Sequence, residues 1–421
     1  MKSVVTIEGL AGGGRGVAKP DGQVWLVSGA LPGEIVEAEV SRSRAGIHEA
    51  TALACLDSPH PAREGQPCPH AQRCGGCDWP HVRPEAGASL KRAVAAGAAR
   101  THPELAQRLA SAPVTPSAAS YRLRSRLHWD PANGRLGFYR RYSWDVTAID
   151  GCRLISPRLT ASLDRLAEIL GPTAPEPVDL DWLEDLDGSE AVVALRPARG
   201  GPSELPQQWL PTPAAARDLV DGWHLLARSG AQLCGWGADG VTMALPVPLR
   251  VPIGSFFQVN RHLALDLFVT VARRVGPGSE PVWDLHGGVG LLAAAASSTG
   301  KRPVTLVEPF RPAARAAEQN LPAARVVVGR TAEAYLSRHR RLAPRAIAIT
   351  DPPRVGMTPR LRNQLSGWHP SRLVTMACDP ATWARDAAFF LERGYGLTDL
   401  ELFDLFPHTS HVELLAQLET E

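Results

Sequence analysis

The sequence predicts a multidomain α/β protein with a small N-terminal β-barrel, a mixed α+β central domain and a C-terminal Rossmann-like domain. Its 421 residues exceed the size of an ordinary single domain. Short β-like runs separated by glycine turns fill the N-terminal segment, which is typical of a barrel. Strand-loop-helix units fill the last third, which indicates a doubly wound sheet. We expect the domains to span residues 1–57, 58–248 and 249–421.

Composition indicates a soluble protein with a large core. Hydrophobic residues make up 44% of the chain and charged residues 21%, and the formal net charge is +2. Binding to nucleic acid would therefore need a local basic face. The start of the chain lacks the apolar core of a signal peptide, and no apolar run has the length of a membrane span. We expect a cytoplasmic monomer without a membrane partner, whose cysteines serve as metal ligands or catalysts rather than in disulfides.

Three β-like runs define the N-terminal segment: Val4–Ile7, Val24–Val27 and Glu34–Val40. The glycine loop between the first two runs, Gly12-Gly-Gly-Arg15-Gly16, is followed by Lys19, so it suits an ordinary hairpin turn or a phosphate contact equally well. The pattern also resembles a TRAM domain, a small OB-like RNA-binding barrel attached to RNA-modifying enzymes. The matching motifs are Gly14-x-Gly16-Val17-Ala18, Asp21-Gly22 and Val27-x-Gly29-Ala30-Leu31-Pro32-Gly33-Glu34.

A loop-rich stretch with three clustered cysteines follows. Five residues separate the first pair and two glycines separate the second, so the backbone can turn tightly and bring the thiolates together. A fourth ligand is expected at the turn Asp150-Gly151-Cys152. Four sulfurs suit zinc or an iron-sulfur cluster, and because zinc ribbons usually show two close pairs, this spacing favours a [4Fe-4S] cluster over zinc. The predicted ligands of this iron-sulfur domain are Cys68, Cys74, Cys77 and Cys152.

The segment Tyr121–Trp129 places a basic residue at every second position. With a period of two, its four bases share one strand face. Such a face is usually no more than solvated, but the barrel precedes it and Arg135, Arg140 and Arg141 follow. We therefore expect an RNA-binding face that tracks a phosphate backbone. Residues 172–213, which are rich in proline and acidic residues, are expected to form loops.

A glycine loop opens the C-terminal domain. The strand Val282–Asp284 leads into Gly287-Gly288-Val-Gly290, which indicates that a nucleotide-like cofactor approaches the backbone. The next strand ends on Glu308, where a carboxylate can accept hydrogen bonds from ribose hydroxyls. An NAD enzyme would need a third spaced glycine, which Leu291–Ala296 lacks. S-adenosylmethionine carries no phosphate and fits better, so we expect a class I S-adenosylmethionine-dependent methyltransferase domain.

Two further strands should deliver reactive groups to the same sheet edge. The run Ala346–Thr350 ends on Asp351-Pro-Pro-Arg354, and the run Arg372–Ala377 ends on Cys378 before an Asp-Pro turn. Doubly wound sheets keep their ligands at the carboxyl ends of the strands. A thiol, a carboxylate and a guanidinium are therefore expected in one cleft.

Taken together, these features resemble the bacterial RNA (uracil-C5)-methyltransferase family, in particular the branch with a TRAM domain and an iron-sulfur cluster that modifies ribosomal RNA. The resemblance covers essentially the whole chain. Each motif alone is weak, whereas five in the family's order are specific. They are Phe257-Gln258-Val259-Asn260, Asp284-Leu-x-x-Gly288-x-Gly290, Asp351-Pro-Pro-Arg354-x-Gly356, Cys378-x-Pro380 and Phe406-Pro-His-Thr-Ser-His-Val-Glu413.

The resemblance implies a covalent mechanism that the chemistry of uracil also demands. Uracil C5 is too weak a nucleophile to take a methyl group from a sulfonium, so the Cys378 thiolate first adds to C6. Glu413 then removes the C5 proton as general base and the thiolate leaves. The target base must be flipped out of folded RNA. The residues implied to bind the cofactor are Gln258, His286, Gly287, Gly288, Glu308, Arg330 and Asp351.

Some positions depart from the family's pattern. His286 and Gly287 stand where an aromatic residue and a cysteine are common, and Arg330 stands where a small polar residue is usual. Asp379 takes the place of an asparagine, and a carboxylate beside Cys378 would disfavour the thiolate unless it points away or is paired. We expect these changes to tune the activity.

Other assignments compete with this one. A catalytically silent RNA-binding scaffold is favoured by the altered glycine loop and would bind no cofactor. An adenine or guanine N-methyltransferase also uses Asp-Pro-Pro, but it needs an aromatic residue where Arg354 stands and has no use for Cys378. A methylthiotransferase combines a TRAM domain with a cluster but differs in cysteine spacing. Among substrates, the cluster and the TRAM domain favour 23S rRNA, with the T-loop of tRNA second.

Overall fold

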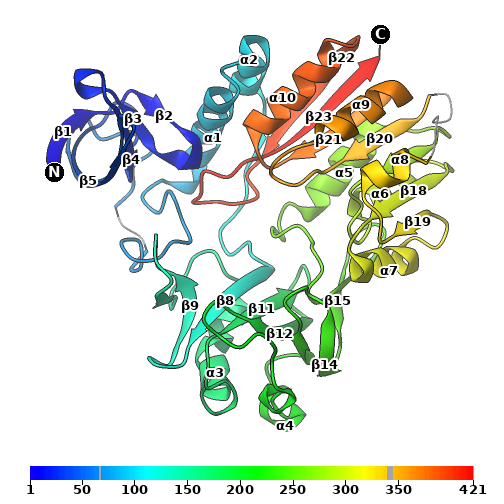
Figure 1. The fold of residues 1–421 in the computed structure, drawn as a ribbon, viewed down its shortest axis with the longest axis horizontal. Helices are drawn as coiled ribbons and strands as arrows, with labels where there is room; N and C mark the ends of the chain where they lie inside the picture. Colours follow the sequence, from blue (N-terminus) through cyan, green and yellow to red (C-terminus); the bar gives the residue numbers. More distant parts are fainter. Residues whose placement is uncertain (66–67, 339–344, 421) are drawn as a thin grey trace.

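The computed structural model describes residues 1–65, 68–338 and 345–420. Three large sheets divide the described chain, and Figure 1 shows them as an N-terminal part in blue, a central part in cyan and green, and a C-terminal part from yellow to red. Helices accompany the second and third sheets, which confirms the predicted multidomain α/β class. In the described ranges no helix is long and apolar enough to cross a membrane.

The N-terminal segment forms a six-stranded sheet, which confirms the predicted strands. Its strands are β1 Lys2–Thr6, β2 Gly9–Leu10, β3 Gly16–Ala18, β4 Val24–Ser28, β5 Ile35–Arg44 and β6 Ile47–Asp57, with short 3₁₀ turns η1 Gly12–Gly14 and η2 Pro20–Gly22. The order is β1-β5-β6-β4-β3-β2. Alternation along the strands buries Val5, Trp25, Val27 and Val36 in a small separate core.

The central sheet has seven strands in the order β10-β9-β8-β11-β12-β13-β14. They are β8 Arg124–Asp130, β9 Arg135–Tyr139, β10 Val146–Ala148, β11 Val178–Glu184, β12 Ala191–Pro197, β13 Gly222–Leu226 and β14 Gln232–Gly237, accompanied by α3 Pro157–Thr173, η3 Gln207–Trp209 and α4 Pro213–Ala216. The expectation of loops over residues 172–213 is wrong, because this stretch supplies two inner strands whose apolar side chains are fully buried. A two-stranded sheet, β15 Gly240–Met243 and β16 Leu249–Pro252, leads to the C-terminal part.

The C-terminal sheet is doubly wound, as predicted. Its strands are β7 Val114–Thr115, β17 Val282–Asp284, β18 Val304–Glu308, β19 Arg325–Val328, β20 Ile347–Thr350, β21 Arg372–Ala377, β22 Tyr395–Phe403 and β23 Glu413–Thr420. The order is β19-β18-β17-β20-β21-β23-β22-β7, with the first five strands parallel and β23 antiparallel to both of its neighbours. The first five strands therefore present their carboxyl ends at one edge.

Helices cover both faces of this sheet, so its strands are almost wholly apolar. One face packs against α5 Ala264–Val275, α6 Leu291–Ser297 and α7 Arg311–Asn320. The other packs against α8 Ala332–Leu336, α9 Pro359–Trp368 and α10 Pro380–Leu391. Two separate hydrophobic clusters result, one on each face.

Residues 84–115 lie against the C-terminal sheet, although the predicted boundary placed them in the central part. They form α1 Pro84–Ala98, α2 Pro103–Ser111 and the edge strand β7, which pairs with β22. Leu105 and Leu109 share a hydrophobic cluster with Trp383 of α10 and Leu402 of β22. The N-terminal half of the chain thus contributes to the core of the C-terminal part.

Replacing Leu109 by alanine tests this packing. Leu109 is fully buried, and removing a buried leucine side chain costs about 2–5 kcal/mol of unfolding free energy. We expect Leu109→Ala to lower the hydrogen-exchange protection of amides in β22 and β23, whereas Val36→Ala in the N-terminal sheet should leave them unchanged. Loss of protection confined to β8, β11 and β12 would contradict this assignment.

Candidate active site

A cleft of about 730 Å³ lies where the carboxyl edge of the C-terminal sheet faces β8 and β11 of the central sheet. Ligands of doubly wound folds bind at this edge, because the loops that follow the strands converge there. The walls therefore come from two parts of the chain. The predicted site residues that line the cleft are Gln258, His286, Gly288, Glu308, Asp351, Cys378 and Glu413.

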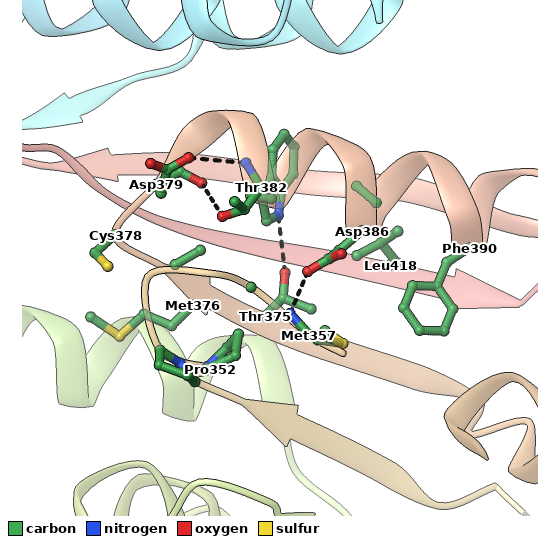
Figure 2. Close-up of a pocket in the computed structure, with 15 residues that line it drawn as sticks. Pro352, Met357, Thr375, Met376, Cys378, Asp379, Thr382, Asp386, Phe390 and Leu418 are labelled. Carbon is green, nitrogen blue, oxygen red and sulfur yellow. Dashed lines mark hydrogen bonds between the residues drawn. The ribbon is translucent and has the colours of Figure 1, made fainter. Parts of the chain in front are cut away.

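Cys378 follows β21 directly and stands at the turn into α10 (Figure 2). Its side chain is half-buried. Burial, together with the nearby carboxyl groups of Glu413 and Asp351, raises the pKa of Cys378 to about 11, while the Arg354 guanidinium acts in the opposite direction. The thiol is therefore mostly protonated at neutral pH, and a change in its surroundings is needed to form the thiolate.

Asp379 is engaged by the helix that follows it. Its Oδ1 accepts hydrogen bonds of 3.0 Å from the backbone N–H groups of Ala381 and Thr382, which caps the N-terminus of α10. Figure 2 shows Asp379 hydrogen-bonded to Thr382. Arg354 lies 4.0 Å from the second oxygen. The Asp379 carboxylate is thus paired, so its charge does not exclude a thiolate at Cys378.

The turn that carries Cys378 is fixed by contacts between β21, α10 and the loop after β20. Trp383 donates a hydrogen bond of 3.2 Å to Thr375 Oγ1, and Asp386 accepts one of 2.7 Å from the backbone of Met357 (Figure 2). All four side chains line a small, mostly apolar cavity behind Cys378. The sulfur is therefore presented from a rigid support.

Three carboxyl groups at the sheet edge have raised pKa values. Burial, with Asp351 and Glu308 nearby, raises the pKa of Asp284 to about 7. Burial also raises the pKa of Asp351 to about 7. Burial and then Asp351 raise the pKa of Glu413 well above its usual value, while Lys91 acts against this. Each group holds its proton more tightly because its charge would be poorly solvated and close to like charges.

Glu308 is held by the glycine loop itself. Its carboxylate accepts a hydrogen bond of 2.9 Å from the Gly288 N–H and one of 2.6 Å from the Phe310 N–H. Burial raises the pKa of Glu308, and these two hydrogen bonds oppose the rise. Gly288 has a φ of 54°, a conformation that favours glycine, and a Cβ there would meet open space. The loop therefore orients the carboxylate and leaves room above Gly288.

Two residues expected at the cofactor lie outside the cleft lining. Gly287 is buried, and a Cβ there would stand 2.1 Å from the Leu306 side chain, so this glycine is required for packing against β18. Arg330 is exposed after β19 and is absent from the lining. The structure therefore does not bring Gly287 or Arg330 to the cleft with the other predicted residues.

The Phe257–Asn260 segment connects the cleft walls. Gln258 is buried and its Nε2 lies 3.9 Å from Met376 Sδ on β21. Asn260 Nδ2 donates a hydrogen bond of 3.1 Å to the carbonyl oxygen of Leu405. Arg124 of β8 donates one of 3.1 Å to the Phe257 carbonyl oxygen and lies over the exposed Phe256 ring. An aromatic face thus stands at the cleft mouth beside a cation.

The loop from Asp404 to Val412 leads into Glu413 and is held by residues that sequence reasoning missed. Asp78 accepts hydrogen bonds from the backbone and hydroxyl of Ser410, at 3.0 and 2.9 Å. Trp79 donates a backbone hydrogen bond of 2.9 Å to the His408 carbonyl oxygen. Lys91 also binds this loop. Their place in the sequence was the one signal that could have identified them, because Asp78 and Trp79 directly follow Cys77, a predicted metal ligand.

Four cysteines line one small pocket, as their spacing suggested. They are Cys68, Cys74, Cys77 and Cys152. Apolar side chains, including Phe138 and Leu154, complete the lining, and burial raises the pKa of Cys77 to about 12. Among the residues the structure describes, no group of three or more Cys, His, Asp or Glu side chains is arranged to hold a metal ion.

The expected open stripe of bases along β8 is wrong in part. Arg126 and His128 face β11 and pair with Asp181 and Asp179 at 2.7 and 2.8 Å, so acidic residues neutralise them. Arg122 instead faces inward, where its charge opposes the rise that burial causes in the pKa of Cys77. The predicted alternation is present, but these bases pair with acidic residues of β11 or lie beside the cysteine pocket.

Stability should depend on pH through Asp284. An exposed aspartate loses its proton near pH 3.8, whereas Asp284 keeps it up to about pH 7. The folded state then holds the additional proton between these values, so its stability falls as pH rises through this window. We expect Asp284→Asn, which mimics the protonated form, to come close to the wild type in unfolding free energy at about pH 4, where the unfolded state is only beginning to lose this proton. At pH 8 it should exceed the wild type by on the order of 1–3 kcal/mol.

Urea unfolding at both pH values measures this difference. Asp386→Asn is the matched control, because Asp386 is equally buried but pairs with Arg362 at 2.7 Å. Removing that paired charge should destabilise the protein at pH 8. Equal stability of Asp284→Asn and wild type at both pH values would show that the pKa of Asp284 is not raised in the folded protein.

Comparisons with known proteins agree with this architecture. The TRAM domain family model matches residues 4–53. The 23S rRNA (uracil(1939)-C(5))-methyltransferase RlmD of Pseudomonas putida is 31% identical over 446 residues, which cover 99% of this chain and 94% of that protein. A Streptomyces avermitilis protein, named an uncharacterized RNA methyltransferase, is 32% identical over 454 residues, which cover 99% and 97% of the two chains.

A solved structure shares the fold along the whole chain. The Pyrococcus abyssi tRNA (uracil-54, C5)-methyltransferase, crystallised in complex with S-adenosyl-L-homocysteine, has a TM-score of 0.73 at 22% identity and covers 99% of this chain and 100% of its own. Because the sequence relatives also match from end to end, the likeness is not confined to a common methyltransferase sheet. This chain belongs to the RNA (uracil-C5)-methyltransferase family.

Proposed function

We propose that this protein transfers a methyl group from S-adenosylmethionine to C5 of a uridine in RNA, with 23S rRNA as the substrate. The observation that carries this proposal is that the Cys378 thiol and the buried Glu413 carboxyl line the same cleft at the carboxyl edge of the sheet. A nucleophile and a base on either side of a bound ring are what methylation of an unactivated pyrimidine carbon requires.

Cys378 acts as the nucleophile. Its sulfur forms a bond to C6 of the uracil, and the electrons of the C5–C6 double bond move toward C5 and the O4 carbonyl. The resulting enolate makes C5 nucleophilic, and C5 accepts the methyl group as its bond to the sulfonium sulfur breaks, which leaves the neutral thioether S-adenosylhomocysteine. Glu413 then takes the C5 proton, the C5–C6 double bond reforms, and the bond from C6 to Cys378 breaks. The thiolate is regenerated and 5-methyluridine leaves.

The charge distribution of the cleft fits a cationic methyl donor. S-adenosylmethionine supplies an electrophilic methyl group on a positively charged sulfonium. Asp284 and Asp351 have pKa values raised to about 7, and Asp284 Oδ2 lacks a hydrogen-bond partner in the described part of the chain. A cation beside them would favour their ionised forms. Glu308, oriented by the Gly288 loop, is suited to ribose hydroxyls.

The RNA would reach Cys378 between the central and C-terminal parts. A uridine in folded RNA must leave its stack to enter such a cleft. The exposed Phe256 ring, with Arg124 beside it, offers a stacking surface at the mouth. The TRAM domain would hold RNA outside the cleft. The names of the bacterial relatives support 23S rRNA, and that of the Pyrococcus protein keeps the T-loop of tRNA as the second candidate.

We also propose that the cysteine pocket holds a [4Fe-4S] cluster, with zinc as the alternative. Cys68, Cys74, Cys77 and Cys152 all line the pocket, and four thiolates match the ligand set of such a cluster. Burial raises the pKa of Cys74 and Cys77, and the Arg122 charge opposes that rise, so this cation would offset the negative charge of a thiolate-bound centre. Its role would be structural, because four ligands leave no iron open.

Two substitutions test the catalytic assignment. We expect Cys378→Ala to bind RNA with unchanged affinity and to transfer methyl groups at least about 10³ times more slowly, because C5 is never activated. Glu413→Gln should still form the thiol adduct and accept the methyl group, but it should trap a covalent protein–RNA species. Labelled methyl transfer to unmodified 23S rRNA and to tRNA, followed by denaturing gel electrophoresis, measures both outcomes.

Near-wild-type turnover of Cys378→Ala would exclude the covalent mechanism. Absence of cofactor binding in calorimetry, with no methyl transfer to either RNA, would favour the silent scaffold instead. Cys234→Ala is the matched thiol control, since Cys234 lies on β14, outside the cleft, and should leave both activities unchanged.

The cluster predicts a visible signature. Anaerobically purified protein should be brown with broad absorbance in the visible range, and Cys152→Ser should lose the colour and iron content. Cys55→Ser, which alters a half-buried cysteine of β6, should keep both. A colourless protein that contains one equivalent of zinc would support the alternative metal.

A further inference from the structure

Lys91 is a fully buried lysine that no step above has used. It lies on α1, and its side chain is completely inaccessible to solvent. Burial lowers the pKa of Lys91, whereas Asp404 raises it. A buried ammonium group is costly unless all its donors are satisfied and an opposite charge is close. Its position therefore calls for an explanation beyond packing.

All three acceptors of Lys91 belong to one loop. Nζ forms an ion pair with Asp404 and donates hydrogen bonds to the carbonyl oxygens of Phe406, at 3.0 Å, and His411, at 2.5 Å. An ammonium group has three donors, so this set is complete. The contacts lie at the beginning and at the end of the loop from Asp404 to Val412. Lys91 thus ties the two ends of that loop together.

The loop ends on the proposed base. Glu413 begins β23 two residues after His411, it is buried, and its Oε2 has no hydrogen-bond partner within the described residues. The rest of the loop is held by Asp78 and Trp79, so its conformation depends on the N-terminal half of the chain. Glu413 has no direct hydrogen-bonded support for that oxygen, and the loop must therefore provide its placement.

We propose that Lys91 is a positioning residue for proton removal: by binding both ends of the 404–412 loop it holds the Glu413 carboxyl beside the Cys378 adduct and supplies the positive charge that favours its ionised form. This inference rests on the proposed role of Glu413. Lys91 touches neither substrate nor cofactor, since it is absent from the cleft lining. Its effect should fall on the step after methyl transfer, because that is the step in which Glu413 takes a proton.

The test is the lifetime of the covalent RNA adduct in Lys91→Met. With unmodified 23S rRNA and S-adenosylmethionine carrying a labelled methyl group, we expect the labelled adduct to form within about 3-fold of the wild-type rate. Its decay should be at least about 10-fold slower, because a misplaced and protonated carboxyl is a poor base. Adduct formation and decay that fall in parallel, or a wild-type decay rate, would overturn the proposal.

Two further variants make the result decisive. Arg274→Met removes another buried cation, which pairs with Asp399 and Glu401 on β22 but does not line the cleft, and it should leave the adduct lifetime unchanged. Lys91→Met/Asp404→Leu removes both charges, so no unpaired carboxylate stays buried if the single variant fails to fold. The double variant should also accumulate adduct, and a wild-type lifetime in it would overturn the proposal.

Glu413→Gln distinguishes an error in the assignment of Glu413 as base from an error in the positioning role of Lys91. If Glu413→Gln traps the adduct and Lys91→Met does not, the base is correctly assigned and the positioning role is wrong. If Glu413→Gln fails to trap the adduct, the proposed base itself is wrong, whatever Lys91→Met does.

Discussion

The crowding of acidic groups at one sheet edge is the constraint on which the site depends. Parallel strands end together, so Asp351 and the Cys378 thiol line one poorly solvated cleft with Glu413, and the fully buried Asp284 lies close enough to Asp351 to feel its charge. Like charges cannot all ionise there, and each group keeps its proton to an unusually high pH. The surroundings relieve this repulsion locally. Asp379 is turned into the cap of α10, and Glu308 accepts two backbone hydrogen bonds.

The N-terminal half of the chain provides contacts that hold the loop before Glu413 in place. Helix α1 packs on the C-terminal sheet, and Lys91 reaches from it into the loop before Glu413. Asp78 and Trp79 hold the same loop from the stretch after Cys77. The Trp79 indole also donates a hydrogen bond of 2.8 Å to Gly14 of the N-terminal sheet. Hydrogen bonds thus connect the N-terminal part to the segment that carries the proposed base.

The strand ends were predictable because their signal is local. An apolar run that stops on Cys378 or Asp351 fixes both the strand and the point where its chemistry begins. The strand β11 lies in a stretch predicted to form loops, because acidic residues and prolines are typical of loops. Yet Val178-Asp-Leu-Asp-Trp182 alternates with a period of two, as a strand does. Those acids are the partners of the bases on β8, so neither pattern was interpretable without the other.

Other features depend on contacts between distant residues, which a single sequence does not reveal. The ion pair between Lys91 and Asp404 spans 313 positions. Gly287 was assigned to the cofactor because glycine loops often approach one, yet its lack of a side chain is needed for contact with Leu306. A glycine can thus be needed either for the approach of a ligand or for close packing in the core, and only its neighbours in the folded protein show which. Arg330 is exposed after β19 and lies outside the cleft lining, which its place in the sequence did not indicate.

The raised pKa of Cys378 has a consequence for the order of events in the proposed reaction. Burial and two neighbouring carboxyl groups oppose thiolate formation, and the Arg354 guanidinium acts in favour of it. A cationic ligand in the same cleft would act in the same direction as Arg354, because its charge favours every ionised group around it. The thiol would then become reactive when the methyl donor is present and stay protonated otherwise. A nucleophile kept neutral in this way is protected from adding to RNA that cannot be methylated.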